Sequence, residues 1–153
     1  MITENFKYIS LDDAIVIHKK TIEHSGGGSH ILLNPGQLES ILEHIKDDSY
    51  YPTFPQKLTH LFFGVCKFHC FTDGNKRLAI TLSTQFLLIN GFLSVAQTFI
   101  RETENISYHV AANHIDKNFL EEILTAMVSY NFENNESLKL RLAIAESQEE
   151  NFY

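Results

Sequence analysis

Hydrophobic residues recur every three or four positions through most of this chain, which is the spacing of amphipathic α-helices. Ser10 suits the N-cap of a first helix, and the glycine run at residues 26–28 suits its end. One face of this helix carries the apolar residues Leu11, Ile15 and Ile22. His18 falls on the same face, so we expect a histidine that is wholly or half buried in the core.

The same spacing predicts three further helices, at about residues 35–45, 56–68 and 75–89. Asn34 followed by Pro35 is a cap with proline at the first helical position, Pro55 opens the next helix, and Asn90-Gly91 stops the last. The positions expected to be buried are Leu38, Ile41, Leu42, Ile45, Leu58, Leu61, Phe62, Val65, Leu78, Leu82, Phe86 and Ile89.

Beyond residue 91 the pattern is less regular. We interpret residues 92–98 as a connector and expect a fifth helix within residues 99–113. A sixth helix would run from Asn118, which we take as its cap, to Tyr130. Its buried face would consist of Leu120, Ile123, Leu124 and Met127.

The tail after the polar break at residues 131–135 fits two templates. From Ser137 onward apolar and polar residues alternate as in a strand, but the residue types are strong helix formers, so we interpret the tail as a seventh helix. Because no run of strands is indicated, the pattern predicts an all-α fold of six to seven helices. We expect a compact domain over residues 1–134 and a helical extension over residues 135–153.

Composition narrows the classes of function. A chain of 153 residues with 44% hydrophobic residues is one domain by length and can bury a substantial core. The net charge of -7 argues against broad nucleic-acid binding, although it leaves room for a local basic pocket. The best apolar run is interrupted by Lys76, Arg77 and Gln85 and is too short to span a membrane. The first eight residues lack the pattern of a signal peptide, so we expect a cytoplasmic protein.

One nine-residue stretch, residues 69–77, gathers side chains that suit phosphate chemistry. His69 can accept a proton near neutral pH, and Asp73 is a hard oxygen ligand suited to Mg²⁺. Gly74 allows a close turn just before a helix N-terminus, where backbone N–H groups favour anions. The following Lys76 and Arg77 add positive charge. Apolar helices on both sides would hold this polar stretch between two buried elements.

Two cysteines near this stretch offer a different interpretation. Cys66, His69 and Cys70 have a spacing that could supply metal ligands. No second pair of ligands accompanies them, and isolated cysteines are more often small buried hydrophobic residues, so we favour the second interpretation.

A polar and then aromatic loop, residues 46–54, contains Pro52 and precedes the third helix. Its aromatic side chains could grip a partner as an extended flap, or they could fasten the loop to the core. The sequence leaves both interpretations open.

The stretch resembles the signature loop of the Fic/Doc family, and specifically that of its death-on-curing branch. The residues that match are His69, Phe71, Asp73, Gly74, Asn75, Lys76 and Arg77. The similarity also includes the glycines after the first helix, the segment from Gln37 to Ser40, Tyr51-Pro52-Thr53, and Leu88 to Gly91. It covers residues from about Tyr8 to Tyr130.

This resemblance implies a helical domain that uses ATP or another nucleoside triphosphate, with Mg²⁺, to modify a hydroxyl group of a protein. Most Fic members transfer AMP, whereas the death-on-curing toxin transfers the γ-phosphate to a translation elongation factor and is restrained by a small antitoxin. By resemblance we expect a protein target of that kind and an antitoxin partner. The lengths of the apolar runs and the net charge argue against contact with a membrane or direct contact with nucleic acid.

The resemblance also assigns roles to residues of this chain. His69 would be the general base that takes the proton of the target hydroxyl, and Asp73 would hold Mg²⁺. Phe71 would be a buried anchor of the loop. The residues that would bind the nucleotide phosphates are Gly74, Asn75, Lys76 and Arg77. The flap residues that would align the target are Tyr51, Pro52, Thr53 and Phe54.

Two positions depart from the pattern of the AMP-transferring members. Lys76 replaces a glycine, and Ile80 stands where a second arginine would be. The loss of a bidentate phosphate ligand and the gain of a long cation both favour phosphoryl transfer over AMP transfer.

A short segment near residue 130 is similar to the inhibitory helix found in this family. Ser129 and Glu133 have the required spacing, and Glu133 would then reach an arginine that binds phosphate. A helix end with exposed polar residues explains the same segment, and we favour that explanation.

Four functions therefore remain to be compared. A Doc-like protein kinase leads, and a Fic-type AMP transferase is its rival within the same class. A catalytically silent module that binds nucleotide or a partner is disfavoured because His69, Asp73, Asn75 and Arg77 are all present. A metal-binding or nucleic-acid-binding module is disfavoured by the net charge and by the absence of a set of metal ligands.

Overall fold

The structure, a computed structural model, describes residues 5–24, 34–67 and 75–148. These residues contain seven α-helices. They are α1 (Leu11–His24), α2 (Pro35–His44), α3 (Phe54–Lys67), α4 (Asn75–Ile89), α5 (Leu93–Ala111), α6 (Lys117–Val128) and α7 (Glu136–Glu146). No strand occurs within these ranges, so the predicted all-α fold is confirmed.

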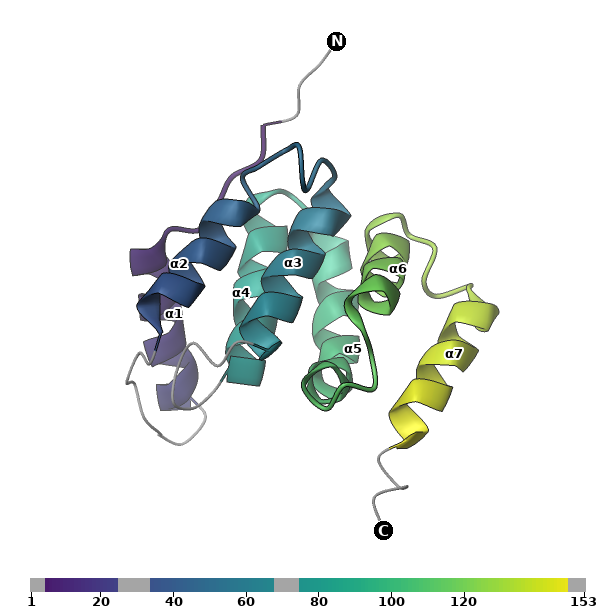
Figure 1. Ribbon diagram of the computed structural model, residues 1–153. Coiled ribbons are helices and arrows are strands. Elements are labelled where there is room, and N and C mark those ends of the chain that lie inside the picture. The colour runs from purple at the N-terminus through teal and green to yellow at the C-terminus, as the bar shows by residue number, and fades with distance from the viewer. Residues whose placement is uncertain (1–4, 25–33, 68–74, 149–153) are drawn as a thin grey trace.

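Helix α3 is the central element of the fold. It packs against α2, α4, α5 and α6, and Figure 1 shows it running through the middle of the molecule between α2 and α6. The four apolar residues predicted for its core face, Leu58, Leu61, Phe62 and Val65, have no exposed surface. Because α3 is tightly packed in the core, the position of its last residue, Lys67, is fixed, and the chain continues from there into residues 68–74.

Local sequence signals set the helix ends that were expected. The Ser10 hydroxyl accepts a hydrogen bond from the Asp13 backbone N–H at 3.1 Å, and Asn34 caps α2 in the same way. Gly91 ends α4 with a φ of +86°, a conformation that favours glycine. His18 is only 1% exposed, which confirms the expected core histidine. Leu11, Ile15 and Ile89, which were expected to be buried, are only half buried.

The predicted start of α5 and the predicted cap of α6 were wrong. Helix α5 begins at Leu93 and absorbs most of the expected connector, because its first turns already bury Val95, Ala96 and Phe99. Helix α6 begins at Lys117, and its cap is Asp116 rather than Asn118. An Asp116 carboxylate oxygen accepts from the Phe119 N–H at 2.8 Å, which stabilises the first turn.

The loop before α3 is fastened to the core. Phe54 is the first residue of α3, two positions before the expected start, and its side chain is 4% exposed. Its ring stacks on Phe86 and Phe92, with centroid distances of 4.8 Å and 4.5 Å. The fully buried Lys57 ammonium donates to the Ile45 carbonyl oxygen and to the Asp48 carboxylate, each at 2.7 Å. The aromatic side chain at position 54 therefore fastens the loop to the core and does not project from it as part of an extended flap.

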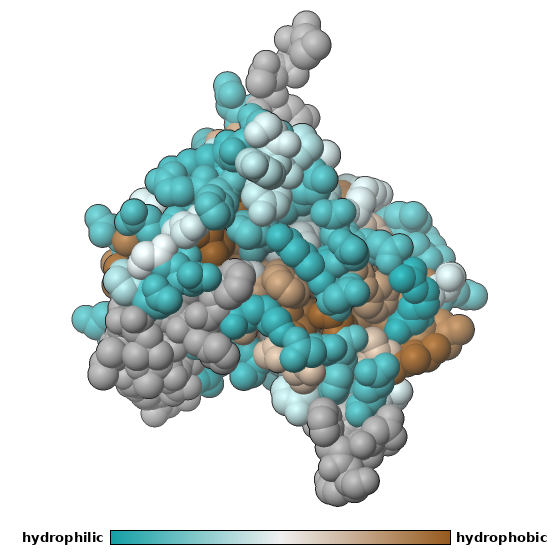
Figure 2. Space-filling view, in the orientation of Figure 1, coloured by the Kyte–Doolittle hydropathy of each residue, from teal (hydrophilic) through white to brown (hydrophobic). Residues whose placement is uncertain are grey.

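The tail forms the predicted seventh helix. Helix α7 packs against α5, burying Leu138, Leu142 and Ala145, and leaves Leu140 and Ile144 exposed. Figure 2 shows hydrophobic surface at the edge of the molecule where α7 lies. The division into a domain over residues 1–134 and an extension over 135–153 stays a prediction. None of the described helices is long and apolar enough to cross a membrane.

Candidate active site

The N-terminal turn of α4 carries the described half of the signature stretch. Asn75 is half buried, and Lys76 and Arg77 are exposed, so both cations can meet a ligand from solvent. The first turn contains no acidic residue. Cations at a helix N-terminus oppose the helix dipole and cost typically 0.3–1 kcal/mol each, whereas a bound anion reverses the sign of that interaction. His69, Phe71, Asp73 and Gly74 lie outside the described residues.

A groove between α1 and α4 continues from this turn. It encloses about 410 Å³, and six of the residues that line it are Ile17, Lys20, Thr21, His24, Arg77 and Ile80. Two further potential cations, Lys20 and His24, come from α1. The surface that the lining residues expose to the groove is nevertheless mainly apolar. The Thr21 and Thr81 hydroxyls lie 3.2 Å apart and join the two helices. The tertiary fold thus adds basic residues to those that the signature supplies, within an acidic chain.

The end of α3 lies close to the same turn. Burial raises the pKa of the Cys66 thiol to about 12, although the nearby charges of Lys76 and Lys67 act in the opposite direction. Cys66 is therefore a neutral buried thiol, which suits a core residue. The described residues contain no group of three side chains that could hold a metal ion, and Cys70 lies outside them.

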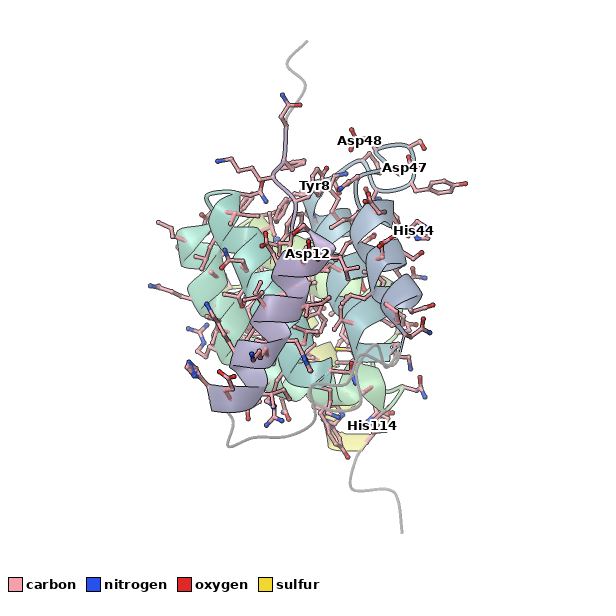
Figure 3. The ribbon with its side chains drawn as sticks, turned by 90° about the vertical axis from the view of Figure 1, so that its left-hand side faces the viewer. Tyr8, Asp12, His44, Asp47, Asp48 and His114 are labelled. Carbon is pink, nitrogen blue, oxygen red and sulfur yellow. The ribbon has the colours of Figure 1, made fainter. Side chains whose placement is uncertain are left out.

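The structure does not bring the predicted flap to this site. The loop at residues 47–53 precedes α3, whereas residues 68–74 follow it, and the 14 residues of α3 span about 20 Å. Figure 1 shows this loop at one end of the bundle and the start of α4 at the other. In Figure 3, His44, Asp47 and Asp48 mark the end that carries the loop, and His114 marks the opposite end.

Thr53 and Phe54 make contacts that stabilise the start of α3. The Thr53 hydroxyl accepts from the Gln56 N–H at 3.3 Å, and the Gln56 side-chain oxygen accepts from the Thr53 N–H at 3.0 Å. This reciprocal pair is a capping box at the start of α3. The threonine and glutamine spacing was a sequence signal for it. Pro52 is exposed, and Tyr51 is half buried.

Sequence reasoning missed a cluster around Tyr51. The Tyr51 hydroxyl lies 3.1 Å from His60 Nδ1, and the Lys117 ammonium lies 3.0 Å from the same nitrogen. Burial and the positive charge of Lys117 lower the pKa of His60 to about 4, so the ring is neutral at pH 7. Since an ammonium can only donate, Nδ1 is the acceptor and Nε2 carries the proton. These contacts join α3, α6 and the loop, which are distant in sequence.

The stability of the protein is expected to fall as the pH drops from 6.5 towards 4. An unfolded His60 takes up a proton near pH 6.5, whereas the folded ring resists protonation until about pH 4, so the unfolded state binds more protons in that interval. Denaturant unfolding between pH 5 and 6.5 should show a slope of up to about 1 kcal/mol per pH unit that is absent in His60→Gln. Equal slopes in both proteins would contradict this assignment.

The ion-pair partners of Glu133 lie away from the start of α4. Its carboxylate pairs with Arg101 on α5 and, at 3.2 Å, with Lys139 on α7. Both cations contribute to lowering the pKa of this carboxyl group. The connection between α6 and α7, which contains Glu133, lies near the opposite end of the bundle from the start of α4 (Figure 1). Ser129 is the C-cap residue of α6. Neither residue is among those lining the groove beside Arg77.

The fold and the site define a helical protein in which α4 presents a cationic N-terminus to a groove between α1 and α4. The chain belongs to the Fic/DOC family, whose model matches residues 8–87, just over half of the sequence. The match includes the whole signature stretch and ends within α4. No curated protein matches the chain. Membership in this family indicates nucleotide-dependent modification of proteins in general.

Proposed function

We propose that this protein transfers the γ-phosphoryl group of ATP, or of another nucleoside triphosphate, to a hydroxyl group of a protein. The observation that carries the proposal is the first turn of α4, where Lys76 and Arg77 stand at a helix N-terminus without an acidic neighbour in that turn. The family match supports nucleotide-dependent transfer, and the choice of γ-phosphoryl transfer is our own inference.

The described donors fit a polyphosphate. Backbone N–H groups at the start of α4 point along the helix axis towards the position of an anion, and Arg77 can offer a planar pair of N–H donors. Mg²⁺ held by Asp73 would neutralise phosphate charge when bound.

Each signature residue then has a defined task. His69 would accept the proton of the target hydroxyl as its oxygen bonds to phosphorus. Gly74 and Asn75 would contribute backbone N–H donors, and Lys76 and Arg77 would stabilise the negative charge on the transferred group. The hydroxyl loses its proton to the imidazole, the bond from the γ-phosphorus to the bridging oxygen breaks, and ADP leaves.

Ile80 supports phosphoryl transfer over AMP transfer. Its half-buried side chain lines the groove next to Arg77, at the position where an AMP-transferring relative would have a second arginine. Because Ile80 is apolar, Arg77 is the one arginine among the described residues that line the groove. Fewer N–H donors are therefore available to bind a second phosphate group. AMP transfer is the alternative that this position disfavours.

Labelled ATP distinguishes these reactions. We expect incubation with cell extract and γ-³²P-ATP to label a protein band, and incubation with α-³²P-ATP to label none. Label from α-³²P-ATP alone would show AMP transfer and overturn phosphoryl transfer. The absence of label from either nucleotide would support a module that only binds nucleotide. The assay requires protein purified free of any co-purifying inhibitor.

The biological setting remains part of the proposal. A translation factor as the target, a small antitoxin as the partner and a cytoplasmic location all follow from the death-on-curing resemblance. Label in the extract would identify the target by the mass of the modified band.

A further inference from the structure

A second hollow lies at the end of the bundle opposite the start of α4. It encloses about 360 Å³ beside the turn that joins α2 to α3, and His44, Asp47, Tyr50 and Tyr51 line it. Figure 3 shows His44 and Asp47 at this end of the molecule. Three of the four side chains are aromatic rings and the fourth is a carboxylate.

The rings form adjoining walls. The Tyr50 and Tyr51 ring centroids are 6.5 Å apart, with their planes inclined at 45°. Behind Tyr51 lies His60, whose ring stacks on it at 4.5 Å and also approaches His44 at 5.9 Å. The hydrogen bond between the Tyr51 hydroxyl and His60 fixes one wall, while Tyr50 is 76% exposed. One wall is therefore held rigidly and the other stands in solvent.

Asp47 supplies negative charge next to these rings. The Ser49 hydroxyl and backbone N–H donate to its Oδ1 at 2.5 Å and 3.0 Å, and these bonds lower the pKa of the carboxyl group. Its other oxygen, Oδ2, makes no hydrogen bond within the part of the chain that the structure describes. The carboxylate is thus ionised and can still accept a hydrogen bond.

Two of the nearby cations, Lys57 and Lys46, are engaged elsewhere. Lys57 is buried and bonded to Asp48, and Lys46 pairs with Glu43 at 3.1 Å. The Lys117 ammonium lies 5.4 Å from the Tyr51 ring centroid while it contacts His60. The Tyr51 ring thus has one ammonium group within cation–π distance, and the Tyr50 ring and the Asp47 carboxylate remain for a second.

We propose that this hollow, which we call the aromatic cage, binds a lysine side chain of a partner protein. Ring faces carry negative charge density and attract alkylammonium groups, and the Asp47 carboxylate provides a charged acceptor. The net charge of -7 favours the approach of a basic segment. Because the cage lies at the start of α3, about 20 Å along that helix from its end at Lys67, it is a docking site separate from the first turn of α4, and it does not rest on the transfer chemistry.

Titration of the protein with short peptides, followed by NMR, tests the cage. The peptides are Ac-Gly-Lys-Gly-NH₂ and its norleucine counterpart, which has a similar length but no charge. We expect the lysine peptide to shift the ring signals of His44, Tyr50 and Tyr51 with saturation, and the norleucine peptide to shift none. Tyr50→Ala and Asp47→Asn should each weaken binding about threefold or more. Tyr130→Ala, which removes a tyrosine of 71% exposure elsewhere, should leave it unchanged.

Three results would overturn the proposal. Equal binding of the norleucine peptide would show that the charge is irrelevant. Unchanged binding in both Tyr50→Ala and Asp47→Asn would place the peptide elsewhere. Larger shifts of the same signals with sodium acetate or phosphate would show an anion site. Circular dichroism of each variant confirms that the helices are retained, so a loss of binding is not a loss of fold.

Discussion

Replacing Phe54 by alanine is expected to lower the free energy of unfolding by about 3–5 kcal/mol. The ring is 4% exposed, and it packs in a stack between Phe86 and Phe92 with Phe6 tilted against it at 5.2 Å. Removing it leaves a cavity at the junction of α3, α4 and the start of α5, and the helices cannot close that cavity without moving α3. Urea denaturation followed by circular dichroism measures the effect.

Tyr50→Ala is the matched control for Phe54→Ala. It removes an aromatic side chain four residues earlier that is 76% exposed, so the free energy of unfolding should change by less than about 0.5 kcal/mol. A Phe54→Ala protein as stable as the parent would contradict the core assignment and restore the view of residue 54 as a flap side chain.

The difference between these two positions shows what sequence patterns can and cannot predict. The core faces of α3 and α4 were predicted because helical spacing is a local property of the chain. Phe54 lies close in sequence to Tyr50, which is exposed, and to Tyr51, which is half buried, and nothing local distinguishes it from them. Its burial depends on Phe86 and Phe92, more than 30 positions away, so only the tertiary structure assigns its role.

The start of α5 was missed for a related reason. The segment from Leu93 to Thr98 contains β-branched and polar residues, which lower the intrinsic preference for helix. Burial of Val95 and Ala96 against the rest of the core outweighs that preference. Asp116 was missed because Asn118, two residues later, is an equally good cap by residue type.

The candidate site also has one part that local sequence predicts and other parts that only the tertiary structure shows. The signature stretch was recognised because seven specified residues lie within nine consecutive positions. The groove needed the structure, since Lys20 and His24 come from α1 and meet Arg77 only through packing of α1 on α4. The cluster of Tyr51, His60 and Lys117 spans more than 60 positions and carries no sequence signature.

His69→Ala is expected to reduce the rate of nucleotide-dependent labelling of the target by about 10²- to 10⁴-fold, the range in which a general base contributes. The alanine leaves the cations of α4 in place, so the affinity for nucleotide should change little while the rate of transfer collapses. The rate is measured as γ-³²P incorporation over time, and affinity as nucleotide binding by calorimetry. A parallel loss of both would mean that His69 holds the nucleotide or the loop and is not the base.

Two companion variants separate the chemistry of His69 from folding and from charge. Arg77→Ala should weaken nucleotide binding as well as transfer, because it removes a phosphate ligand that is already exposed at the start of α4. Lys19→Ala, an exposed change on α1 outside the groove lining, should alter neither quantity. If His69→Ala retained most of the labelling activity while Arg77→Ala lost it, the chain would still use the cationic helix start, but the proton of the target hydroxyl would have to leave by another route.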